Sequence, residues 1–189
     1  IWHQEIEDIL VLKNNKGTED NRVRKLDYSI QVSKLFYERF IKDEDITLFS
    51  PHECPDLYEA FGMPEFDEMY EKYERKTSIS KQKVRAQTLF MDLLKERAET
   101  GRIYIMNIDH CNTHSSFKDK VYMSNLCQEI TLPTKPVQHI DDPEGEIALC
   151  ILSAINLGMI KDKEELEELC DLSVRALDEI IDYQEYPVE

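Results

Sequence analysis

Long apolar runs are missing from this 189-residue sequence. No stretch approaches the roughly 18 apolar residues that a transmembrane helix needs. The first residues also lack the basic, apolar and small-residue sections of a signal peptide. We therefore expect a soluble, cytoplasmic protein that does not associate with a membrane.

Positive charge is scarce as well, because 23 basic residues stand against 39 acidic ones and the formal net charge is -16. Residues 22–25 form a short basic run, and such runs usually remain in water as the charged entry to a helix. A nucleic-acid backbone would require a larger cluster of lysine and arginine. Nucleic acid is therefore not an expected partner.

The five cysteines include no Cys-x-x-Cys pair, and their odd number argues against a closed disulfide framework of the secretory type. Cys54, Cys111 and Cys170 are expected to be structural. With 41% hydrophobic and 33% charged residues, and without repeats or low-complexity segments, the composition predicts a globular domain with a real core. Because the chain begins at Ile1 and not at a methionine, we interpret residues 1–189 as a single partial domain, an internal segment of a longer protein, with no separate second domain.

Hydrophobic spacing predicts helices and strands that alternate as in an α/β fold. Helices are predicted over residues 2–14, 30–41 and about 80–99, in a short stretch that starts at Pro55, along the stripe of Phe66, Met69, Tyr70 and Tyr73, and after a capping Asp162. Strands are predicted at residues 46–49, 103–106, 125–132 and 147–157, with Gly101 ending the helix before the second of them.

Residues 109–114 place four potential metal ligands within six positions. In a helix, His110 and His114 would face the same side, as zinc-binding pairs do. However, Asn112-Thr113 favours a loop, and no further histidine or cysteine cluster supplies a convincing fourth ligand. We therefore expect hydrogen-bonding loop residues here and no metal site.

The segment Ser124–Pro133 carries three different chemical groups. Alternation along an extended segment places Asn125, Cys127 and Glu129 on one face, roughly 6 to 7 Å apart, so that an amide, a thiol and a carboxylate can contact one sugar-sized substrate. The alternative is an edge strand with a buried structural cysteine. Cys150, in the predicted strand 147–157, is likewise inert packing unless it faces a reactive group.

The segments SNLCQEITLPTKP and GEIALCILSAINLG together resemble the active-site region of the large, catalytic subunit of class I ribonucleotide reductase. The resemblance continues in the same order through LVLKNNKG, NRVRKLDY, DITLFSPHE, GRIYIMNIDHCNTHS and RALDEIIDYQEYP, and so covers essentially the whole chain. The family fold is an α/β barrel of ten strands, in which a finger loop carries a cysteine into the centre. Cys127 matches that cysteine, which implies that this chain is the central part of such a barrel.

The resemblance also implies roles for individual residues. Cys127 would become a thiyl radical that abstracts the hydrogen at the ribose 3′ carbon. Glu129 would take the proton from the 3′ hydroxyl, Asn125 would hold the hydroxyl groups, and Leu126 belongs to the same substrate-binding motif. Cys150 matches one of two redox-active thiols, whose partner in the family lies outside this sequence.

By the same resemblance, the partners are a ribonucleoside diphosphate substrate, a metal-containing small subunit that supplies the radical, thioredoxin or glutaredoxin, and a second copy of the complete large subunit. The chain itself would bind no metal or cofactor, and nucleotide effectors would bind mostly outside it. Because family parts for diphosphate binding and radical delivery are absent, we expect the chain alone to be inactive. Two alternatives stay open: a catalytically silent acidic α/β scaffold, and a split-gene piece that assembles with separately encoded flanking pieces.

Overall fold

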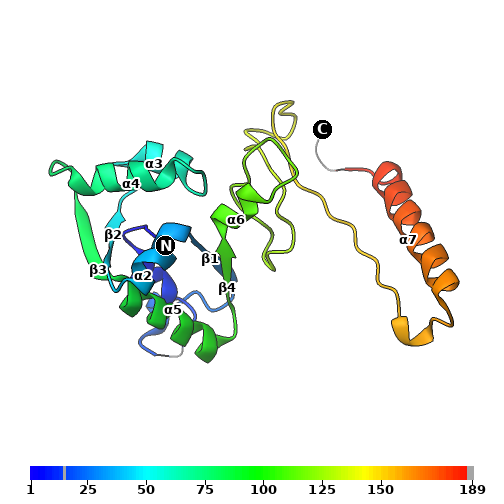
Figure 1. Ribbon diagram of the computed structural model, residues 1–189, viewed down its shortest axis with the longest axis horizontal. Coiled ribbons are helices and arrows are strands. Elements are labelled where there is room, and N and C mark those ends of the chain that lie inside the picture. Colours follow the sequence, from blue (N-terminus) through cyan, green and yellow to red (C-terminus); the bar gives the residue numbers. More distant parts are fainter. Residues whose placement is uncertain (15, 187–189) are drawn as a thin grey trace. The chain divides into compact units, whose positions relative to one another are not determined.

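A computed structural model describes residues 1–14 and 16–186, and the chain divides into two units, Ile1–Pro133 and Thr134–Glu189 (Figure 1). The first unit mixes helices with short strands. In chain order it contains α1 (Ile6–Leu10), η1 (Glu19–Asn21), β1 (Tyr28–Val32), α2 (Lys34–Ile41), β2 (Asp45–Phe49), α3 (Pro55–Ala60), α4 (Phe66–Arg75), β3 (Lys81–Arg85), α5 (Ala86–Thr100), β4 (Ile103–Asn107) and α6 (Ile108–Thr113). The second unit contains η2 (Leu157–Met159) and α7 (Lys163–Tyr183). A single domain over residues 1–189 stays a prediction.

The strands of the first unit form two separate pairs. β1 runs parallel to β4, with Tyr28 opposite Ile103, and β2 runs antiparallel to β3, with Asp45 opposite Arg85. α5 contacts both β3 and β4, and α2 and α5 lie between the two pairs in the view of Figure 1. The architecture is therefore mixed α/β, and no sheet closes into a barrel within residues 1–14 and 16–186.

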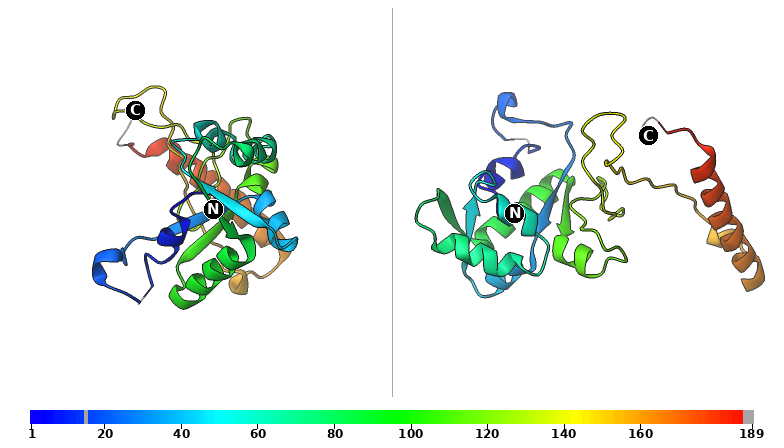
Figure 2. Two further views of the ribbon diagram at one scale, coloured as in Figure 1. Left: turned by 90° about the vertical axis from the view of Figure 1, so that its left-hand side faces the viewer. Right: turned by 90° about the horizontal axis from the view of Figure 1, so that it is seen from above.

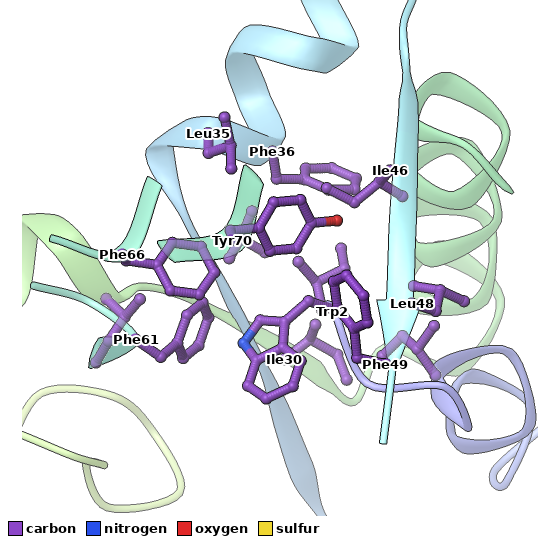
Figure 3. Packing of buried hydrophobic residues seen from close by; sticks show 14 of the residues in the cluster. Trp2, Ile30, Leu35, Phe36, Ile46, Leu48, Phe49, Phe61, Phe66 and Tyr70 are labelled. Carbon is purple, nitrogen blue, oxygen red and sulfur yellow. The ribbon is translucent and has the colours of Figure 1, made fainter. Parts of the chain in front are cut away.

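Aromatic and aliphatic side chains pack together in the core of the first unit (Figure 3). The fully buried Tyr70 contacts Phe49 and Phe66, with ring centroids 5.4 and 5.5 Å apart. Trp2 meets Phe61 edge to face at 5.9 Å, the arrangement that the ring quadrupoles favour. The predicted core positions of Trp2 and of the stripe on α4 are confirmed.

Elements with a strong local signal form where the sequence predicts them. β2, β4 and the short helix α3, which has Pro55 in its first turn, are confirmed. Gly101 ends α5 in the left-handed conformation, with a φ of 67° and its N–H donated to the carbonyl of Arg97. Asp162 caps α7 by accepting a hydrogen bond from the backbone N–H of Glu165 at 2.8 Å.

Other predicted elements are wrong in type or length. Residues 2–14 contain only the short α1, and residues 30–41 divide between the end of β1 and α2. The helix predicted over 80–99 begins only at Ala86, because the preceding backbone pairs with β2 as strand β3. Residues 109–114 are almost entirely helical, as α6, and not a loop.

The strands predicted at 125–132 and 147–157 do not form. After an isolated bridge between Lys135 and Glu146, the chain runs without helix or strand to η2 (Figure 2). An extended segment becomes a strand only when another backbone pairs with it, and neither segment has such a partner in the part of the chain that the structure describes. Among these residues, no helix has the length and apolar character needed to cross a bilayer.

Candidate functional site

The residues of the predicted site motif lie in a turn and not along a strand. The backbone N–H of Gln128 donates to the carbonyl of Asn125 at 3.3 Å, so Leu126 and Cys127 occupy the middle of the turn. Gln128 has a φ of 72°, a left-handed conformation that costs a residue with a side chain roughly 1 kcal/mol. The thiol of Cys127 is free and exposed at the tip of this turn.

Asn125 holds the turn together with its own side chain. Its carboxamide oxygen accepts the backbone N–H of Ile130 at 3.0 Å, while its carbonyl oxygen accepts the side chains of Gln128 at 3.2 Å and Ser124 at 2.8 Å. The amide of Asn125 is therefore half-buried, whereas Cys127 and Glu129 are exposed. The prediction that Asn125, Cys127 and Glu129 share one face of an extended segment is wrong, because the side chain of Asn125 is bound within the turn.

Tyr104 of β4 is a neighbour of Cys127 that sequence reasoning missed. The charge of the adjacent Cys127 thiolate, followed by a hydrogen bond between the two side chains, raises the pKa of the Tyr104 phenol. The two residues are far apart in the sequence, and no motif links them. Only the path of the chain from β4 back to the turn could have revealed this contact.

Cys150 belongs to the second unit and lies between the isolated bridge and η2. Its thiol is free and exposed, so the interpretation as a buried packing residue is wrong. The proximity of Cys150 to Cys127 stays a prediction. Cys54 behaves differently: it is fully buried and donates to the carbonyl of Ser50 at 3.0 Å, and burial raises the pKa of its thiol to about 11.

The side chains of α6 make hydrogen bonds to their surroundings. The rings of His110 and His114 meet edge to face with centroids 5.6 Å apart, and Nδ1 of His114 lies 3.1 Å from the carbonyl oxygen of His110. Asp109 accepts the backbone N–H of Lys34 at 2.8 Å. In residues 1–14 and 16–186, no group of three or more histidine, cysteine, aspartate or glutamate side chains is arranged to hold a metal ion.

Comparison with known proteins identifies the family. The profile of the family described as "Ribonucleotide reductase, barrel domain" matches residues 1–189. The chain belongs to this family. This chain is 58% identical over 193 residues to "Ribonucleoside-diphosphate reductase subunit alpha" of Buchnera aphidicola subsp. Schizaphis graminum, and the match covers 100% of the chain and 25% of that protein.

Other reductase relatives give the same result. The protein of the same name from Haemophilus influenzae is 60% identical over 193 residues, which is 100% of this chain and 26% of that protein. "Ribonucleoside-diphosphate reductase 1 subunit alpha" of Escherichia coli K12 is 58% identical over 142 residues, covering 72% of this chain and 19% of that protein. The chain thus spans about a quarter of the length of the first two relatives. These matches confirm the family resemblance and favour it over a catalytically silent scaffold.

Proposed function

We propose that this chain supplies the radical-forming cysteine, Cys127, of a ribonucleoside-diphosphate reductase large subunit. The observation that carries the proposal is the family match over residues 1–189, which includes the Asn125–Glu129 motif. In the complete protein, the chain forms part of a ten-stranded α/β barrel and the Cys127 turn is the finger loop. The reaction converts ribonucleoside diphosphates into deoxyribonucleoside diphosphates, the precursors of DNA.

Cys127 starts the reaction as a thiyl radical. It takes the hydrogen atom from the ribose 3′ carbon, so an S–H bond forms as the C–H bond breaks and the radical moves to the substrate. The two bonds are similar in strength, which allows the same thiol to return the hydrogen at the end. An exposed thiol at the tip of a turn supports this role, because the sulfur must reach the substrate.

Glu129 and Asn125 assist the loss of the 2′ hydroxyl. The exposed carboxylate of Glu129 takes the proton of the 3′ hydroxyl as a general base. Because the carboxamide oxygen of Asn125 is bound to the N–H of Ile130, the amide N–H groups remain to hold the substrate hydroxyls, with Leu126 beside them.

Cys150 supplies reducing equivalents. Together with a second thiol outside this chain it gives two electrons and two protons, so that the 2′ hydroxyl leaves as water, a C–H bond replaces the C–O bond, and the two sulfurs end as a disulfide. The balance of the reaction is therefore one alcohol and two thiols converted into one deoxy product, one disulfide and water.

The proposed partners follow from the same family membership. A metal-containing small subunit supplies the radical, thioredoxin or glutaredoxin reduces the disulfide, and the complete large subunit forms a homodimer in the cytoplasm. The chain itself holds no cofactor, and nucleotide effectors bind mostly elsewhere in the complete protein.

The test is Cys127→Ser in the complete large subunit, assayed with its small subunit and a ribonucleoside diphosphate. We expect turnover to fall by roughly 10⁴-fold or more, as when an essential catalytic side chain is removed. Cys170→Ser is the matched control, since Cys170 is another exposed free thiol, on α7, and its replacement should change turnover by less than about two-fold. Deoxynucleotide formation by Cys127→Ser at the wild-type rate would refute the proposal.

A further inference from the structure

Asn112, in the last turn of α6, binds both backbone groups of Val121. The N–H of Val121 donates to Oδ1 of Asn112 at 2.8 Å, and Nδ2 of Asn112 donates to the carbonyl of Val121 at 3.1 Å. The same Nδ2 donates to the carbonyl of Ile108 at 3.2 Å. One side-chain amide thus serves Val121 as a neighbouring strand would, by satisfying its donor and its acceptor together.

Val121 lies on the segment that leads to the Cys127 turn, and this segment is fixed on several sides. The side chain of Val121 is fully buried. The carbonyl of Tyr122 accepts Nε2 of Gln31 at 2.7 Å, and the Tyr122 hydroxyl donates to the carboxylate of Glu59 at 3.1 Å. Lys120 also donates to the backbone carbonyl of Glu59. Residues from β1, α3 and α6 therefore hold the backbone at 120–122.

α6 is itself held firmly enough to act as an anchor. Asp109 accepts the N–H of Lys34 at the start of α2, and Ile108 is buried. On the other side, a Cβ atom placed on Gly62 would lie 2.5 Å from Cγ1 of Ile108 and 3.0 Å from Nδ2 of Asn112. The helix therefore has little room to move toward the turn that holds Gly62, and its position is transmitted to Val121 through Asn112.

We propose that Asn112 is a positioning residue for Cys127. The turn is closed by hydrogen bonds that Asn125 accepts from the backbone N–H groups of Gln128 and Ile130, and only a short stretch joins it to the fixed backbone of Val121. A displacement at Val121 therefore moves the thiol. The consequence of this displacement for catalysis rests on the proposed function of Cys127. Misplacing a reacting atom by about 1 Å can lower the rate about 100-fold.

The sequence predicts hydrogen-bonding residues at 109–114, and two of these side chains have such a role. Asp109 accepts the N–H of Lys34 at the start of α2, and Asn112 fixes the segment that approaches Cys127.

The test uses Asn112→Ala and Asn112→Asp in the complete reductase, with Asn107→Ala as the matched control. Asn107 directly precedes α6, and its side chain makes no capping hydrogen bond to the helix but accepts the hydroxyl of Tyr37 at 2.8 Å, so its loss removes a contact at the start of α6 without touching Val121. We expect Asn112→Ala to lower kcat by about 10- to 100-fold with KM changed by less than about two-fold. Asn112→Asp keeps the acceptor for the Val121 N–H, so its kcat should fall less than that of Asn112→Ala. The kcat of Asn107→Ala should stay within about two-fold of the wild-type value.

A second readout does not depend on turnover. The rate at which iodoacetamide alkylates Cys127, measured by mass spectrometry, should change by at least about three-fold in Asn112→Ala and leave Cys170 unaffected, because exposure and surroundings set thiol reactivity. If Asn112→Ala does not fold, Asn112→Asp is used, with hydrogen exchange of the Val121 amide as the added measurement.

Wild-type kcat and wild-type Cys127 alkylation in a folded Asn112 variant would overturn the proposal. So would an equal loss of kcat in Asn107→Ala, since the effect would then reflect the stability of α6. The two proposals fail separately: an active Cys127→Ser enzyme rejects the radical role, whereas the alkylation rates still decide whether Asn112 positions the turn.

Discussion

Cys54 and Cys127 show how the surroundings separate two identical side chains. Cys54 is fully buried and its pKa is raised to about 11, first by desolvation, so its thiol is protonated at neutral pH. Because the folded-state pKa lies above the ordinary value of 9.0, this protonated thiol contributes to stability below pH 9.0 and the contribution is lost as the pH rises toward 11. Cys127 is exposed, and its charge is the main cause of the raised pKa of the Tyr104 phenol.

We therefore predict that iodoacetamide labels Cys127 at least about ten times faster than Cys54 in the native chain at pH 8, because only an accessible thiolate reacts. Mass spectrometry of peptides after short labelling times measures both rates. In denaturant the two rates should converge. Equal rates in the native protein would contradict the described burial of Cys54.

The sequence could identify site residues only where they stand close together along the chain. Asn125, Cys127 and Glu129 stand in one short motif, so their chemical types and spacing are visible without a structure. The path of the chain brings Tyr104 beside Cys127 and brings Asn112 to Val121 on the segment before the turn, and neither residue belongs to a motif that points to Cys127. The turn itself was missed, because alternation of side chains does not distinguish an unpaired extended segment from a strand.

At the scale of elements, β2, β4 and α3 were predictable because their signals are local: a short apolar run or a proline in a first turn. β3 was not, since the polar sequence of Lys81–Arg85 forms a strand only through its pairing with β2. Helical spacing from Val84 onward therefore extended the predicted helix too far toward the N-terminus. Pairing between distant segments overrides local propensity.

Gly62 tests how closely the turn after α3 approaches α6. Both Gly62 and Gly101 have positive φ, 83° and 67°, but a Cβ on Gly62 would meet Ile108 at 2.5 Å, while Gly101 has nothing within 4 Å. Gly101→Ala should cost about 1 to 2 kcal/mol from backbone strain alone. Gly62→Ala should cost about 1 to 3 kcal/mol more, because overpacking adds to the strain. Thermal unfolding of the complete protein compares the two, and equal losses would contradict the close approach.

A partly buried ion pair joins α2 to α4. Arg39 and Glu74 make two hydrogen bonds of 2.6 Å, with side chains only 12% and 18% exposed, and Glu74 also accepts the hydroxyl of Thr47. Arg39→Ala should destabilise this region by about 3 kcal/mol, because the carboxylate stays behind without its partner. Arg75→Ala is the control: its pair with Glu71 is 75% and 49% exposed and should contribute less than about 1 kcal/mol.

Hydrogen exchange of the Thr47 amide, which donates to the hydroxyl of Tyr70, measures the local free energy of opening in both variants.

Burial opposes ionisation of Glu74, but the hydrogen bonds from Arg39 and Thr47 prevail and lower its pKa below the ordinary value of 4.5. The stabilising contribution is therefore present above pH 4.5 and is lost as the pH falls through the lowered pKa. Glu74→Gln should remove this pH dependence. An unchanged acid profile in Glu74→Gln would contradict the account.

At the scale of the whole chain, the two units differ in how they bury apolar surface. The first unit has one hydrophobic core cluster, whereas none of the described residues of α7 is buried. Exposed apolar side chains along α7 include Leu172, Val174, Ile180 and Ile181. A helix of this kind gains its stability in proteins mainly from packing of its apolar face.

We predict that the amides of α7 exchange rapidly in the isolated 189-residue chain, with protection of less than about ten-fold, since a single unpacked helix is only marginally stable. The amide of Leu93, on the buried side of α5, is the internal control and should be protected far more strongly. In the complete reductase, α7 should become protected as other segments cover its apolar face. Protection of α7 equal to that of Leu93 in the isolated chain would disprove this prediction.

We propose that Cys127 and Cys150 act together in the complete protein. The most direct measurement is the distance between the sulfur atoms of Cys127 and Cys150 in a crystal structure of the complete large subunit. We predict roughly 4 to 7 Å in the reduced protein, with the side chains of Asn125 and Glu129 facing the same cavity, allowing for the looser geometry of an unliganded site. Cys127 and Cys150 in separate packed regions would contradict the claim, and the chain would then be a degenerate relative of the reductases.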